Sequence, residues 1–160
     1  MVAISVGNEN NLAITADGGL WSWGINWNGQ LGIGVFQQPS HYGLPPTPDS
    51  FRASPVRILE DVSAVSAGSG HSVAIRTDGS LWAWGMGTQG QFGVGTTRQL
   101  LTPTRLMDGI IAAYAGDFMT LLVMEDGSLW ATGSSWGGIG DGTTEQRLHP
   151  VLIKEQVLLP

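Results

Sequence analysis

The chain has 160 residues, and seven Lys and Arg against thirteen Asp and Glu give a net charge of -6 at pH 7. This length suits one domain with its own hydrophobic core. The acidic balance, with Lys154 as the only lysine, argues against a surface that neutralises nucleic-acid phosphates. The absence of cysteine excludes disulfides and thiolate chemistry, and it is compatible with a reducing or an oxidising compartment. We expect neither a signal peptide nor a membrane span, because no apolar run approaches ~20 residues.

One motif occurs three times along the chain. Each copy starts with Asp-Gly, contains Leu-Trp and ends with glycine, at residues 17–24, 78–85 and 126–133. The match extends upstream to Gly7, Gly68 and Gly116. Downstream, it extends to glycine-rich segments at residues 29–34, 90–95 and 138–142, of which the last is one residue shorter. So many shared positions in a fixed order indicate an internal repeat.

Each repeat predicts a series of short strands, which the second repeat shows most clearly. Residues 62–67 are small and β-branched, and residues 71–76 and 80–84 place large apolar side chains at alternate positions. The Asp-Gly between the last two segments predicts a hairpin, since glycine supplies the positive φ of the turn. A short apolar segment then begins at Pro55, Pro103 and Pro150 in the respective repeats. No helical period competes, so the chain is predicted to be all-β.

The repeats divide the chain into units that are too small to bury both faces of a sheet alone. They therefore have to stack on one another, and the radial stacking of such sheets is a β-propeller. The predicted single partial propeller covers residues 1–160, with repeats at 1–61, 62–109 and 110–156, an insert at 36–51, and the start of a fourth first strand at 157–160.

Three blades form an open arc with two uncovered sheet faces, which soluble monomers avoid. Two arrangements would cover these faces. The chain is either part of a larger propeller, or identical chains close the ring by head-to-tail oligomerisation. The sequence favours neither arrangement over the other.

The second repeat resembles the repeats of the regulator of chromosome condensation family. The resemblance rests on Gly68, the pair His71 and Ser72, the Asp-Gly turn, the Trp-Gly that ends at Gly85, and the Gly-Gln segment 90–95. It implies a propeller, typically of seven repeats, that acts in protein–protein interaction. The founding member is a nucleotide exchange factor for a small GTPase and also docks on chromatin. Exchange activity belongs to particular loops of that member and not to the repeat motif, so the resemblance does not carry it over to this chain.

The residues offer little for catalysis, cofactor binding or metal binding. Residues 85–90 match the dinucleotide pattern G-x-G-x-x-G, but a further glycine-rich segment follows them where that site needs a helix. His41, His71 and His149 lack the short spacing of a metal site, and adjacent strand residues such as His71 and Ser72 point to opposite faces. We therefore expect no enzyme activity, no cofactor and no metal.

Aromatic residues outside the strand pattern are the candidates for partner contact. Trp21, Trp23, Trp82, Trp84 and Trp130 lie in register on strands and are predicted to be core residues. Trp27 and Trp136 lie in loops that no structural period explains, and the insert adds Phe36, Tyr42 and Phe51. Since aromatic anchors dominate interface energetics, we predict that these five residues contact a protein partner. The alternatives are that they cover the ends of the blades, that the chain only self-assembles with no partner of its own, or that it is an enzyme or nucleotide-exchange regulator with a site in the propeller channel.

Overall fold

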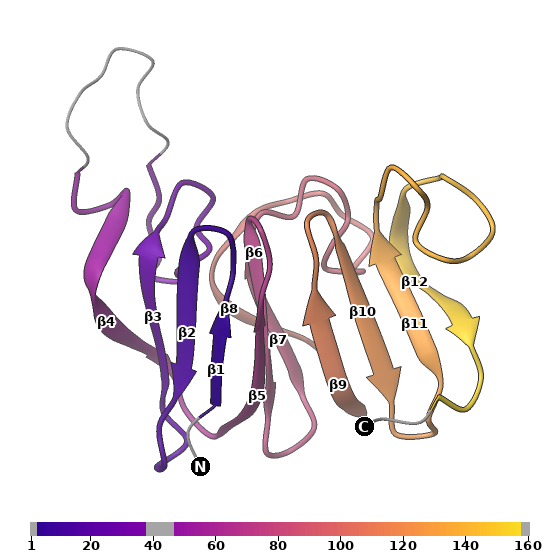
Figure 1. Ribbon diagram of the computed structural model, residues 1–160, viewed down its shortest axis with the longest axis horizontal. Coiled ribbons are helices and arrows are strands. Elements are labelled where there is room, and N and C mark those ends of the chain that lie inside the picture. Colours follow the sequence, from indigo (N-terminus) through magenta and orange to yellow (C-terminus); the bar gives the residue numbers. More distant parts are fainter. Residues whose placement is uncertain (1–2, 38–46, 158–160) are drawn as a thin grey trace.

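The computed structural model describes residues 3–37 and 47–157, which form three four-stranded antiparallel sheets (Figure 1). Strands follow one another across each sheet in chain order, so each sheet corresponds to one predicted repeat. The first sheet contains β1 (Ala3–Val6), β2 (Asn10–Ile14), β3 (Leu20–Ile25) and β4 (Phe51–Leu59). The second contains β5 (Val62–Ala67), β6 (His71–Arg76), β7 (Leu81–Gly85) and β8 (Leu100–Met107). The third contains β9 (Ile110–Ala115), β10 (Met119–Met124), β11 (Leu129–Gly133) and β12 (Arg147–Lys154).

The predicted Asp-Gly hairpins join the second and third strands of every sheet. In the second sheet Gly79 has φ 78°, and the carboxylate of Asp78 accepts hydrogen bonds from the hydroxyl and the backbone N–H of Ser80 at 2.5 and 3.0 Å. These bonds stabilise the charged form of Asp78 and lower the pKa of its carboxyl. The turn chemistry therefore explains the aspartates without a role as metal ligands.

The proline-containing segments form the fourth and outermost strand of each sheet. Pro55, Pro103 and Pro150 lie inside β4, β8 and β12, several residues after the strands begin. Proline has no N–H for a strand ladder, and an edge strand tolerates this loss.

The three sheets follow one another across the molecule in chain order (Figure 1). Among the first strands, β1 packs against β5, and β5 packs against β9. The fourth strands contact one another much less, so neighbouring sheets diverge from their inner to their outer strands. This wedge-like divergence is the geometry of a β-propeller, and three blades of it confirm the predicted fold class.

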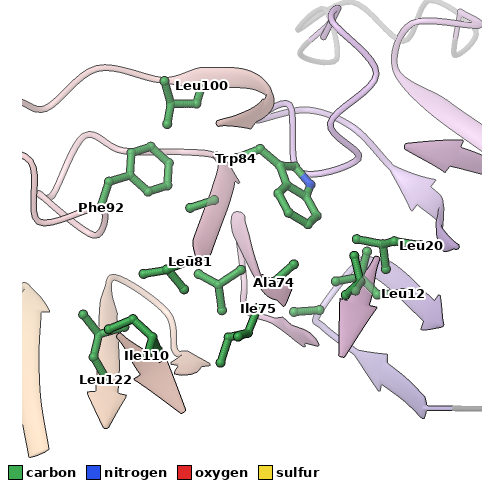
Figure 2. Close-up of a cluster of buried hydrophobic side chains, with 14 of the residues drawn as sticks. Leu12, Leu20, Ala74, Ile75, Leu81, Trp84, Phe92, Leu100, Ile110 and Leu122 are labelled. Carbon is green, nitrogen blue, oxygen red and sulfur yellow. The ribbon is translucent and has the colours of Figure 1, made fainter. Parts of the chain in front are cut away.

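Apolar side chains between the blades form one continuous core (Figure 2). Leu12 and Ala74 are fully buried between the first and second sheets, and Leu122 is buried in the third. Of the five strand tryptophans, the structure fully buries only Trp84, and it leaves Trp21, Trp23, Trp82 and Trp130 half-buried. The core prediction was therefore too broad. Trp82 lies near the hairpin end, where its indole N–H donates to Ser80 at 3.0 Å, and Trp23 lies on the uncovered side of the first sheet.

Buried polar side chains join each blade to the next at equivalent positions. The side-chain amide of Asn10 donates to the hydroxyl of Ser72 at 3.0 Å, and His71 Nε2 lies 3.0 Å from the hydroxyl of Thr120. His71 and Ser72 therefore bond to different neighbouring blades, as expected for adjacent strand residues that face opposite ways. They stabilise the joints between blades and do not form a nucleophile–base pair.

Glycine-rich loops form a second contact at each joint, near the outer strands. The indole N–H of Trp84 donates to the carbonyl oxygen of Gln30 at 2.8 Å, and the hydroxyl of Thr132 donates to that of Gly90 at 2.8 Å. A Cβ atom on Gly32 would lie 2.9 Å from Cδ1 of Trp84, so a larger residue could not approach as closely. The predicted repeat glycines are therefore needed where one blade docks on the next.

Burial lowers the pKa of His71 to about 4. An unfolded chain titrates this imidazole near 6.5, so unfolding takes up a proton between these two values. The neutral His71 therefore makes its full contribution to the free energy of unfolding above about pH 6.5, and this contribution declines as the pH falls towards 4. A pKa shift of this size lowers the free energy of unfolding by about 3 kcal/mol between these two pH values.

His71→Asn is expected to remove this dependence, because asparagine already occupies the equivalent position in the first blade. Urea unfolding between neutral pH and about pH 4.5 measures the effect. We expect the free energy of unfolding to fall less steeply for this variant than for the wild type. His149→Asn, at an exposed position, is the matched control and retains the wild-type slope. Parallel curves for the wild type and His71→Asn would contradict the prediction.

Candidate functional site

The loops that carry the candidate residues all lie on one side of the propeller. In an antiparallel blade, the turn between the first two strands and the loop between the last two share one edge (Figure 1). We call this side the loop rim. It is defined by the turns at residues 7–9, 68–70 and 116–118 and by the described loop residues at 26–37, 47–50, 86–99 and 134–146. The Asp-Gly hairpins lie on the opposite side.

Trp136 is the most exposed large apolar residue on the loop rim. It is 97% exposed, and it borders a hollow of about 570 Å³ with Phe118, which is 37% exposed. Gln89 of the second blade and Ser134, Ser135 and Thr144 of the third complete the lining. The hollow therefore combines two aromatic side chains with several hydroxyl and amide groups, as protein-binding sites do.

Phe118 was missed by the sequence reasoning. It occupies the turn position of Glu9 and Gly70, so the repeat does not require a large apolar side chain there. A large aromatic residue at a turn position where the other repeats have Glu9 and Gly70 was the sequence signal that could have identified Phe118. The structure brings Phe118 next to Trp136 because the backbone N–H of Ser134 donates to the carbonyl oxygen of Phe118 at 2.9 Å.

Hydrogen bonds and ion pairs hold the loop around this hollow. Arg147 donates to the carboxylate of Asp141 at 2.6 Å and to that of Glu145 at 3.0 Å. The bond from Arg147 lowers the pKa of Asp141, which also accepts the backbone N–H of Thr143. The loop segment that contains Thr144 is therefore fixed on both sides before any partner binds.

Trp27 lies in a different part of the rim. It is half-buried and borders a hollow of about 430 Å³ with Trp23 and Phe51 on the uncovered side of the first blade. Trp27 and Trp136 belong to the first and third blades, so the structure does not bring them into one site.

Asn26 holds together the two described segments that flank residues 38–46 in the first blade. The fully buried side-chain amide of Asn26 donates to the carbonyl oxygens of Val35 at 2.6 Å and Asp49 at 3.0 Å. Phe36 is 39% exposed at its start, and Phe51 is 37% exposed and is the first residue of β4. Tyr42 lies outside the described residues.

Metal-ligand clusters and membrane-spanning helices are both absent from residues 3–37 and 47–157. This part of the chain contains no group of three or more His, Asp or Glu placed to hold a metal ion. Within the same residues, no helix has the length and apolar character that a membrane crossing requires.

Family models for the regulator of chromosome condensation (RCC1) repeat match residues 17–75 and 78–123, and a second model of that repeat matches residues 1–30 and 62–91. The chain belongs to the RCC1 repeat family. The resemblance expected from Gly68, His71 and the Asp-Gly turns is thereby confirmed.

Curated relatives match a little over half of the chain. It is 36% identical over 94 residues to the ultraviolet-B receptor UVR8 of Arabidopsis thaliana, covering 58% of this chain and 19% of the relative. It is 39% identical over 98 residues to the probable E3 ubiquitin-protein ligase HERC3 of Homo sapiens, covering 59% of this chain and 8% of the relative. The chain thus spans less than a fifth of the length of either relative.

Solved structures confirm the fold over nearly the whole chain. Prp20p of Saccharomyces cerevisiae superposes with a TM-score of 0.77 at 22% identity, covering 96% of this chain and 38% of Prp20p. Human WBSCR16 superposes with a TM-score of 0.73 at 24% identity, covering 96% of this chain and 39% of WBSCR16. Both similarities concern the arrangement of the blades.

Trp136 and Trp84 are expected to differ sharply in their effect on stability. Trp136→Ala removes a side chain that is almost entirely in water, so the free energy of unfolding should change by no more than about 0.5 kcal/mol. Trp84→Ala opens a cavity between two blades and should lower it by about 3–5 kcal/mol. Chemical denaturation of both variants measures the difference. A large loss of stability in Trp136→Ala would show that this residue is structural.

Proposed function

We propose that this propeller segment is a non-catalytic protein-interaction module that binds a protein partner through the loop rim. The principal contact is the hollow formed by Trp136 and Phe118. The observation that carries this proposal is the 97% exposure of Trp136 beside that hollow. A tryptophan so placed contributes nothing to the core, and it offers a partner a large apolar surface.

The site is suited to binding because the surrounding backbone is already ordered. The N–H of Gly138 donates to the carbonyl oxygen of Ser135 at 3.0 Å, so a closed turn carries Trp136. Binding to a preformed loop loses less conformational entropy than binding to a flexible one. The tryptophan can therefore act as an anchor, with the serines and Thr144 as polar contacts around it.

Two solved propellers of this fold give coarse support. Prp20p has been characterised for its binding to Gsp1p and histones, and yeast RCC1 (Prp20) has been crystallised with Kap60 bound to it. These partners belong to Prp20p. For the present chain they support only the general proposal that a propeller of this kind binds proteins.

The first blade supplies a secondary contact in this proposal. Trp27, Phe36 and Phe51 would extend the interface along the same rim, and Tyr42, outside the described residues, stays a predicted contact. Because the first and third blades are separate, this contact adds to the one at Trp136 and does not replace it.

Affinity capture with a labelled chain tests the proposal. The chain is immobilised in three forms, wild type, Trp136→Ala and Leu152→Ala, and proteins retained from the source lysate are quantified by mass spectrometry. Leu152 is an exposed apolar residue on β12 away from the hollow, so it is the matched control. We expect at least one protein whose recovery falls about 30-fold with Trp136→Ala, as for an interface anchor worth about 2 kcal/mol.

The control has to retain that same protein at the wild-type level. Equal recovery of every bound protein by the wild type and Trp136→Ala would contradict a role for the hollow. A fall with Leu152→Ala as well would point to non-specific adhesion through apolar surface.

A further inference from the structure

The hollow beside Trp136 lies at the joint between the second and third blades, and a methionine fills the equivalent place at the first joint. An added Cβ on Gly70 would lie 3.0 Å from Cε of Met86, so the Met86 side chain covers this glycine. The second joint carries Phe118 at the position of Gly70 and Ser134 at the position of Met86. The short serine side chain leaves room beside the phenyl ring, and the hollow of about 570 Å³ occupies it.

Trp136 and Phe118 give this hollow an aromatic wall that is open to solvent. Trp136 is 97% exposed and Phe118 is 37% exposed. The second blade has Thr88 at the position of Trp136, and Thr88 is exposed although blades lie on both sides of it. The exposure of this position is therefore a property of the rim loop itself. An indole held there presents its ring face to a ligand, and such faces attract cations.

The polar groups of the hollow are uncharged hydrogen-bond acceptors. They are one amide and three hydroxyls, from Gln89, Ser134, Ser135 and Thr144. Each of these groups has an oxygen that accepts a hydrogen bond. Arg147, at the start of β12, already forms ion pairs with Asp141 at 2.6 Å and with Glu145 at 3.0 Å. The hollow therefore suits a ligand that donates hydrogen bonds better than it suits an anion.

Asp117 adds a carboxylate at the inner edge of the same joint. It directly precedes Phe118, it is exposed, and its carboxylate accepts a hydrogen bond from the hydroxyl of Ser69. Ser69 in turn accepts the side-chain amide of Asn8 at 2.8 Å, so hydrogen bonds across three blades hold the carboxylate in place. None of the ion pairs formed within residues 3–37 and 47–157 includes Asp117. Its negative charge is therefore available to a partner.

We propose that the partner inserts an arginine side chain into this hollow. The inference rests on the proposed function and names the group that the hollow recognises. The guanidinium stacks on the indole of Trp136, and its N–H groups donate to Asp117 and to the hydroxyls of the lining. Arginine suits the site because its head group is planar, has five donors and no acceptor, and is more weakly hydrated than an ammonium group. The net charge of -6 also favours the approach of a basic segment.

Titration of the 160-residue chain with short peptides tests this proposal by NMR. Three peptides of the form acetyl-Gly-Ser-X-Ser-Gly-amide carry arginine, citrulline or proline at X, and citrulline keeps the shape of arginine without its charge. The indole N–H resonance of Trp136, assigned with Trp136→Phe, and the side-chain amide of Gln89 are followed. We expect the arginine peptide to shift both resonances saturably, with a dissociation constant at least about five-fold lower than that of the citrulline peptide at low ionic strength.

A charge-neutral variant of Asp117 tests the electrostatic part. Asp117→Asn keeps an oxygen that can accept from Ser69, and it should raise the dissociation constant of the arginine peptide about three-fold without changing that of the citrulline peptide. Asp49→Asn is the matched control, because it makes the same change at an exposed rim position of the first blade. It should leave both constants at their wild-type values. Circular dichroism confirms that each variant is folded.

Four outcomes would overturn the proposal. They are equal dissociation constants for the arginine and citrulline peptides, tighter binding of the proline peptide, an arginine peptide that shifts neither resonance, and a folded Asp117→Asn that binds the arginine peptide as the wild type does. None of them contradicts the proposed function, which depends on the loss of a captured protein from Trp136→Ala. The two failures are therefore distinguishable.

Discussion

The close approach of neighbouring blades at their inner strands is the constraint on which the rest of the structure depends. A Cβ atom on Gly7 would overlap the carbonyl oxygen of Gly68, and one on Gly68 would overlap that of Gly116. Glycine is therefore required at these positions because the neighbouring blade leaves no room for a Cβ atom. Because the backbones come so near, buried polar side chains can bond directly across the joint, as Asn10 does to Ser72 and His71 to Thr120. The blade-to-blade interface is thus specific as well as apolar.

This specificity makes the two uncovered faces of the arc chemically different. The first blade presents Val6, Asn11 and Trp23, whose counterparts are all bonded in the internal joints. The third blade presents Tyr114 and Met119, where the other blades carry small or hydrogen-bonding residues.

Joints cover both faces of the second blade, and rim residues such as Ser69 also bond to both neighbouring blades, through Asn8 and Asp117. The joints constrain much of the loop rim, but some of its positions take part in no joint, and the candidate residue Trp136 occupies one of them, since it is 97% exposed. Phe118 and Trp136 could enter such positions without disturbing a joint. The ion pairs of Arg147 and the amide of Asn26 order the loops locally, so exposed aromatics are held at fixed positions above a rigid scaffold.

The sequence by itself determined the repeat, the strands, the Asp-Gly hairpins and the propeller, because each depends on local chemistry that recurs in register. It also singled out Trp136, a residue that no structural period requires. Only the tertiary structure decided which strand tryptophan is buried, since Trp84 and Trp23 have equivalent local sequences and differ only in whether a blade covers them. It likewise brought Phe118 to Trp136 and set Trp27 beside Trp23 and Phe51. These relations depend on contacts between segments far apart in the chain, which no local pattern encodes.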